Sequence, residues 1–312
     1  MQKNTGAGGR NLNIEIWRII FCLVIVLYHI GMVFEKNLLG AGYLCVEFYF
    51  ILSGYGVYRA YQKIEMTRKS GAFFSYAGRR LLRLYPMYLC AMALMLAVRL
   101  LTGEIPPDGV WAYLKDCRAE FVMLQCSPLG GSVMVLTDWY VATLFWGSLL
   151  IMLLLLVGGR VTSLAICPVA SILLYGYFAR LIAKIDVIAS YYGFLRALAG
   201  LGLGVFLGAV TQLWTGRKQD NDNGNGKAGY VIAAATANLI LAGVTVYFQF
   251  GVRSLWDFAV IALFFVALML LVSTGRNTSG RMPAAVGDLS RLTYPVYLFH
   301  LPILEMIAGF LG

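Results

Sequence analysis

Long apolar runs alternate with short polar segments along almost the whole chain of 312 residues. A helix needs about 20 largely apolar residues to cross a bilayer, and nine runs have this character. We therefore predict nine transmembrane helices, with a tenth either between residues 120 and 137 or around 180–190. The nine predicted spans are residues 14–33, 42–61, 84–102, 139–157, 161–178, 192–214, 229–250, 256–274 and 292–311.

No polar stretch is long enough to build a soluble domain. We expect an all-α fold, a polytopic transmembrane helix bundle that forms a single membrane-embedded domain over residues 1–312. The segment at residues 216–227 (GRKQDNDNGNGK) cannot bury a core and is predicted to be a flexible cytoplasmic loop. The first apolar run contains Arg18 and His29 and lacks a following small-residue cleavage site, which indicates a retained helix rather than a signal peptide.

Composition and charge support a membrane protein and give it an orientation. Hydrophobic residues make up 60% of the chain and charged residues 13%, whereas soluble domains average roughly 45–50% and about 25%. Residues 59–83 carry seven Lys or Arg against one acid, while residues 103–138 carry five acids against two basic residues. Since basic loops stay in the cytoplasm, we predict a multi-pass protein of the plasma (inner) membrane with a cytoplasmic N-terminus. The net charge of +10 then reflects topology, and we expect membrane lipids rather than nucleic acid as partners.

The first span carries three ionisable residues, Glu15, Arg18 and His29. Arg18 and His29 are eleven positions apart, which is close to three helical turns, so they share one face at a separation of roughly 16 Å. Glu15 lies near that face, three residues before Arg18. A cation at the inner end could hold phosphates, and a neutral imidazole deeper in the bilayer could act as a general base. Snorkelling by Arg18 and a structural helix contact by His29 would explain the same spacing.

The second span carries Glu47 near its outer end. A carboxylate inside a bilayer needs a proton, water or a partner. His29 lies at a similar depth, so a contact in which Glu47 stabilises the imidazolium is possible, and a hydrogen bond to another helix is the alternative. Ser53 and Gly54 suggest a close approach of helices, and Ser53 lacks the GxSxG setting of a nucleophile.

Arg80 and Arg83 precede the third span at a spacing of three, so both point the same way on a helix. Paired guanidinium groups match phosphate geometry, although ordinary positive-inside charge would also explain them. Aromatic residues before the pair and Pro86 after it predict an interfacial helix that ends where the chain turns into the membrane.

The last span places His300 between Pro295 and Pro302, which predicts a kinked helix and favours a hydrogen-bonding role for this histidine over a catalytic one. The six cysteines form no CxxC pair, so we predict no metal site. Cys117 and Cys126 share one predicted external loop, where an oxidising compartment would allow a disulfide.

Four segments, taken in order, resemble the acyltransferase 3 family of membrane O-acyltransferases. These are Arg18-x10-His29 with Glu15, the run CVEFYFILSGYGV (similar to the family's GV(D/E)xFFVLSG, with Cys45 in place of the usual glycine), Arg80-x-x-Arg83, and YPVYLFHLP (similar to SYxxYLxH). The resemblance implies a bundle of about ten helices that moves an acyl group, usually acetyl from cytoplasmic acetyl-CoA, to a hydroxyl of a cell-surface or exported carbohydrate or glycolipid. It implies that His29 is catalytic and that Arg18, Arg80 and Arg83 bind the CoA phosphates.

The expected mechanism is direct transfer, in which His29 deprotonates the acceptor hydroxyl and Glu47 or Glu15 tunes its charge. A transient acyl-His29 intermediate is the two-step alternative. The competing class is a transporter or flippase for glycan precursors, which would also use intramembrane charges but would not turn over a CoA thioester. A non-catalytic scaffold would leave those charges unexplained. We expect no appended SGNH-hydrolase-type domain, so the membrane domain or a partner should select the acceptor.

Overall fold

The computed structural model describes residues 11–67, 71–188, 190–218, 226–251, 254–274 and 283–311, which form helices joined by loops and contain no strand. The α-helices are α1 (Leu12–Val33), α2 (Cys45–Thr67), α3 (Ala72–Leu101), α4 (Val110–Asp116), α5 (Arg118–Phe121), α6 (Trp139–Val161), α7 (Cys167–Tyr177), α8 (Tyr192–Lys218), α9 (Gly226–Phe250), α10 (Trp256–Thr274) and α11 (Ala284–Leu311). Short 3-10 turns are η1 (Gly42–Leu44), η2 (Pro107–Gly109) and η3 (Leu136–Asp138), and π-helical turns are η4 (Thr162–Ile166) and η5 (Phe178–Ile182).

Seven of the described helical segments are long and apolar enough to cross a membrane, so the predicted class of all-α membrane helix bundle is confirmed. One of the seven, Leu136–Ile182, contains two predicted spans, 139–157 and 161–178, joined at Gly159 and η4. The helix α2 covers the predicted span 42–61 but is not one of the seven, since Glu47, Arg59 and several tyrosines make it more polar. The count of nine or ten spans stays a prediction, and the described parts of 120–137 and 180–190 contain only short helical turns.

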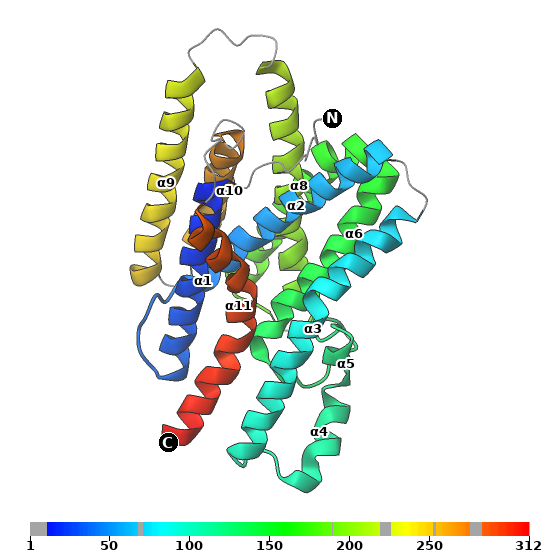
Figure 1. The fold of residues 1–312 in the computed structure, drawn as a ribbon, viewed down its shortest axis with the longest axis vertical. Helices are drawn as coiled ribbons and strands as arrows, with labels where there is room; N and C mark the ends of the chain where they lie inside the picture. The colour runs from blue at the N-terminus through cyan, green and yellow to red at the C-terminus, as the bar shows by residue number, and fades with distance from the viewer. Residues whose placement is uncertain are drawn as a thin grey trace.

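The ends of the helices divide between two sides of the molecule (Figure 1). The start of α1, the end of α8 and the start of α9 lie on one side, while α4 and α5 lie on the other. This arrangement agrees with the predicted alternation of loops, in which the first side would be cytoplasmic. The predicted flexible loop at 216–227 lies largely outside the described residues, because α8 reaches Lys218 and α9 begins at Gly226.

The packing of α2 along α8 forms the centre of the bundle. A Cβ atom on Gly54 would lie 2.0 Å from the backbone oxygen of Leu201, and one on Gly204 would lie 1.9 Å from that of Ile51. Only glycine allows two helix backbones to approach this closely. The predicted role of Gly54 in a close helix contact is therefore confirmed, and its partner is α8.

The helix before the third span does not end near Pro86 as the sequence predicted. The structure has one helix, α3, that continues through Pro86 as far as Leu101. A proline removes only one backbone donor, whereas leaving the helix inside a bilayer would leave several polar backbone groups without partners. The same reasoning explains why α11 contains both Pro295 and Pro302 and bends along its length in Figure 1.

Candidate active site

The two histidines of the chain meet where α1 packs against α11. Nε2 of His300 lies 3.2 Å from Nδ1 of His29, and the two rings are 4.8 Å apart. Nδ1 of His29 also lies 2.9 Å from the backbone oxygen of Ile25, and Nδ1 of His300 lies 2.6 Å from that of Tyr297. Each imidazole is therefore anchored to its own helix through Nδ1 and to the other helix through the pair.

These contacts favour one placement of the ring hydrogens. A carbonyl oxygen only accepts hydrogen bonds, so the assignment that satisfies both carbonyls makes each Nδ1 a donor, and a neutral imidazole then keeps a lone pair on Nε2. Nε2 of His300 directs its lone pair at the His29 Nδ1–H. Nε2 of His29 receives no hydrogen bond from any described residue, and the side chain is only half-buried. The arrangement leaves His29 Nε2 as a free basic nitrogen.

Arg18 lies on the same seam, nearer the start of α1. Its Nη1 forms a 2.7 Å ion pair with Glu15, and its Nη2 lies 3.4 Å from the Thr293 hydroxyl on α11. The side chain is 23% exposed. Thr293 precedes His300 on α11 as Arg18 precedes His29 on α1, so the two helices run parallel along the seam. The stripe predicted on α1 therefore faces α11 rather than lipid.

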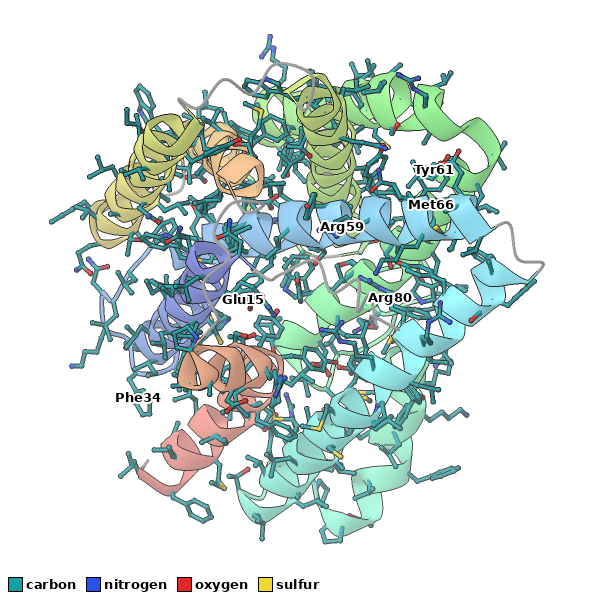
Figure 2. The ribbon with its side chains drawn as sticks, turned by 45° about the horizontal axis from the view of Figure 1, so that its top comes forward. Glu15, Phe34, Arg59, Tyr61, Met66 and Arg80 are labelled. Atoms are coloured by element: carbon teal, nitrogen blue, oxygen red, sulfur yellow. The ribbon has the colours of Figure 1, made fainter. Side chains whose placement is uncertain are left out.

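The two arginines of α3 occupy different environments. Arg80 is half-buried; its Nη1 lies 3.4 Å from the Tyr76 hydroxyl, and its buried Nε has no hydrogen-bond acceptor among the described residues. Arg83 is exposed and acts electrostatically on Tyr294. Figure 2, which looks toward the α8–α9 side, shows Arg80 on α3 and Glu15 on α1 on opposite sides of the region that α1, α2, α3 and α11 surround.

Tyrosines connect the arginine end of the site to the histidine end. Tyr140 on α6 lies within electrostatic range of both Arg18 and Arg80. Its ring is 5.1 Å from that of Tyr297, which is in turn 5.8 Å from the His300 ring. Ring contacts thus link Tyr140 to the histidine end of the site, and its electrostatic link is to the two arginines. The sequence reasoning did not identify Tyr140.

Glu47 contacts Arg196 and Tyr175 rather than His29. Its Oε1 forms a 2.5 Å ion pair with Nε of Arg196 on α8, and its Oε2 accepts a 2.5 Å hydrogen bond from the Tyr175 hydroxyl. Arg196 and Glu47 are 1% and 0% exposed. Arg196 Nη2 also donates to the backbone oxygen of Tyr43 at 3.1 Å, and its guanidinium lies over the ring of Trp139. The contact between Glu47 and His29 that the sequence allowed is not formed.

The acid that acts electrostatically on His29 is Asp186, in the loop before α8. Asp186 also lies 3.9 Å from Nη1 of Arg196, so one network includes His29, Asp186, Arg196 and Glu47. Sequence analysis missed both Asp186 and Arg196. An arginine inside the predicted span 192–214 was a usable signal, because intramembrane charges require partners, whereas nothing in the sequence pattern marks Asp186.

The remaining candidates do not add to the site. All six cysteines are free thiols, so Cys117 and Cys126 do not form the disulfide that their shared loop would allow. The Ser53 side chain lies close enough to Tyr140 to interact with its hydroxyl. Within the described ranges, no group of three or more His, Cys, Asp or Glu side chains is arranged to hold a metal ion.

Comparison with known proteins identifies the family. The model of the acyltransferase 3 family, described as an acyltransferase domain, matches residues 11–312. Comparisons with curated proteins and with solved structures give no significant match. The match includes the α1–α11 seam and both ends of the site. This chain is a multi-pass membrane acyltransferase and belongs to the acyltransferase 3 family.

Proposed function

We propose that this membrane acyltransferase is an O-acetyltransferase of the plasma membrane, with its N-terminus in the cytoplasm. It moves acetyl from cytoplasmic acetyl-CoA to a hydroxyl group of a cell-surface or exported carbohydrate or glycolipid. The observation that carries the proposal is the arrangement of the α1–α11 seam. A histidine with a free Nε2 and an arginine with access to phosphate lie on one face of α1, and both contact α11.

The reaction uses His29 as general base. Nε2 removes the proton of the acceptor hydroxyl while the hydroxyl oxygen attacks the thioester carbonyl carbon. The C–S bond breaks, and the CoA thiolate takes the proton from the imidazolium, so the products are the acetyl ester and CoA. A base in this position contributes roughly 10²–10⁴-fold to the rate. His300 is a positioning residue, because it holds His29 Nδ1–H and thereby fixes the tautomer.

The arginines bind the donor. Guanidinium groups match phosphate oxygens in geometry and charge. Arg18 and Arg80 both lie within range of Tyr140, and the buried Nε of Arg80 keeps an unused donor. We assign the CoA phosphates to Arg18, Arg80 and Arg83, with the pantetheine arm extending toward His29.

The acids have supporting roles. Glu15 orients Arg18 through its 2.7 Å ion pair. Asp186 stabilises the imidazolium that forms on His29, since its charge acts on that ring. Glu47 acts indirectly by fixing Arg196, which in turn holds Asp186 beside the site. We therefore place Glu47 in the mechanism as a positioning residue.

The proposal is tested with purified protein in lipid nanodiscs, by measuring CoA release from acetyl-CoA in the presence of a carbohydrate acceptor. We expect His29→Ala to lose at least about 100-fold in rate. The control Leu27→Ala, on the exposed side of α1, should retain full activity. Wild-type activity in His29→Ala would contradict the base assignment. No thioester turnover in the wild-type protein would favour a glycan transporter or flippase instead. Acetyl label trapped on the protein without acceptor would indicate the two-step route.

Mass spectrometry of surface glycans tests the acceptor and the acyl group. Cells that express the protein should carry glycans heavier by one acetyl group than cells that lack it. A different mass increment would replace acetyl by another acyl group. An unchanged glycan profile would contradict a carbohydrate acceptor.

A further inference from the structure

A second polar group lies buried between α3 and the start of α6, away from the seam. It contains Glu120, Gln125, Thr137 and Asp138, which are 0%, 5%, 2% and 0% exposed. In Figure 1, the start of α6 points toward the side where α4 and α5 lie, opposite the proposed cytoplasmic side. Four polar residues buried together at this position require an account of their hydrogen bonds.

Glu120 is satisfied by its own chain. Its carboxylate accepts the backbone N–H groups of Met134 at 2.5 Å and Val135 at 3.1 Å. These two bonds hold the loop before η3 against α5. Glu120 therefore has a structural role. It shows how a buried acid at this end of the fold is satisfied by protein N–H groups, and Asp138 can be compared with it.

Asp138 lacks such partners. It is the N-cap residue of α6, a position where Asp normally accepts N–H groups of the first turn, but its side chain makes no capping bond. Both of its carboxylate oxygens are buried, and neither has a hydrogen-bond donor among the described residues. Buried polar oxygens without hydrogen-bond donors are costly for a folded protein, and a ligand that supplies donors would satisfy them.

Two neighbouring side chains present the same chemistry. Gln125 donates its Nε2 to the Tyr88 hydroxyl at 3.0 Å, which leaves its buried Oε1 without a donor. The buried Oγ1 of Thr137 also has no partner within the described part of the chain. Tyr88 lies within electrostatic range of Asp138, and Thr137 directly precedes Asp138 in the chain, so the unpaired oxygens of Asp138, Gln125 and Thr137 belong to one buried polar region. All of these atoms accept hydrogen bonds.

This position is connected to the proposed base. The Tyr297 hydroxyl donates to the backbone oxygen of Thr137 at 2.9 Å, and the Tyr297 ring contacts His300. Asp138 also acts electrostatically on Tyr297. A ligand bound here would be linked to the histidine pair through Tyr297.

We propose that Asp138, Gln125 and Thr137 form an acceptor subsite, in which they accept hydrogen bonds from hydroxyl groups next to the one that is acylated. The subsite would therefore select acceptors that carry several adjacent hydroxyls over simple alcohols. The inference rests on the proposed function for the identity of the ligand as acceptor. It extends the reaction site from the α1–α11 seam to the α3–α6 region.

The test measures binding without turnover. Wild-type protein in nanodiscs, without acetyl-CoA, is titrated calorimetrically with methyl glucoside, methyl galactoside, methyl mannoside and cyclohexylmethanol, which carries one hydroxyl. At least one glycoside should bind more tightly than cyclohexylmethanol. Asp138→Asn should weaken binding of that glycoside by about 10- to 100-fold, because the amide replaces one acceptor oxygen by a donor. The matched control is Asp116→Asn, since Asp116 is an exposed acid of the same loop region that binds Ser132, and it should bind like wild type.

Thr137→Val is the second variant, because it removes only an unpaired hydroxyl and should fold at least as well as wild type while binding the glycoside several-fold more weakly. Absence of glycoside binding to the wild-type protein, or equal binding by wild type, Asp138→Asn and Thr137→Val, would overturn the inference. A thermal shift that follows sodium concentration and disappears in Asp138→Asn, without any response to glycosides, would assign the site to a cation instead. CoA release by the wild-type protein is scored separately, so loss of the subsite is distinguished from failure of the proposed function.

Discussion

Replacing Glu47 by Gln should destabilise the protein far more than breaking a comparable ion pair at the surface. Glu47 and Arg196 form a 2.5 Å pair in which both side chains are almost completely buried. Glutamine keeps the shape but removes the charge, so the Arg196 guanidinium would keep the 3.9 Å contact with Asp186 and the bond to the Tyr43 carbonyl without a paired carboxylate at Glu47. The substitution therefore leaves the Arg196 charge buried without its carboxylate partner, and this lowers the free energy of unfolding.

The magnitude follows from burial. Removing one partner of a buried ion pair costs about 3–5 kcal/mol, whereas an exposed pair contributes about 0–1 kcal/mol. The chain contains a matched control, the pair of Arg99 and Glu104 at 2.6 Å, in which Glu104 is 55% exposed. At roughly 2 °C per kcal/mol for a large domain, we expect Glu47→Gln to lower Tm by about 6–10 °C and Glu104→Gln to lower it by less than about 2 °C.

The assay is thermal unfolding of the purified variants in one detergent, followed by tryptophan fluorescence. A double variant, Glu47→Met with Arg196→Met, should recover most of the lost stability, because an apolar pair avoids the desolvation cost. Equal shifts for Glu47→Gln and Glu104→Gln, or no recovery in the double variant, would refute the burial argument. Activity need not recover in the double variant, since it also removes the partner of Asp186.

Three further outcomes are expected. His300→Ala should lower kcat by about 10-fold or more and alter the pH–rate profile while the KM for acetyl-CoA stays constant; an unchanged profile would contradict its positioning role. Burial raises the pKa of Glu120 to about 7. The protonated carboxyl therefore stabilises the fold at acid pH, and this contribution, on the order of 3 kcal/mol, is lost as the pH rises from about 4.5 through 7. Glu120→Gln should flatten this part of the Tm–pH curve. Gly54→Ala should cost about 1–3 kcal/mol or more by forcing α2 from α8, while Gly56→Ala, with open space around it, should be neutral or stabilising in thermal unfolding.

The helices and the stripe on α1 were predictable because they depend on local periodicity. Apolar runs of bilayer length define spans, and the eleven-residue spacing of Arg18 and His29 places both on one face whatever the other helices do. The structure adds that this face contacts α11 through Thr293 and His300. The interpretation of His300 as a hydrogen-bonding residue was confirmed, but its partner is the proposed base itself.

The partners of the buried charges were not predictable. Similar depth suggested a contact between Glu47 and His29. In the structure Glu47 instead forms an ion pair with Arg196, because α2 packs along α8. Which helices become neighbours depends on the packing of small residues such as Gly54 and Gly204, and a single sequence does not reveal which two will meet. The unpaired state of Asp138 is likewise visible only in three dimensions, since its sequence position alone suggests an ordinary helix cap.

The histidine pair joins residues that are 271 positions apart in the chain. During synthesis, His29 therefore enters the membrane long before the residue that fixes its tautomer has been made. The growing polypeptide carries a histidine without its orienting partner until α11 inserts beside α1. An enzyme that uses His29 as proposed would therefore have its oriented base only once α11 has inserted.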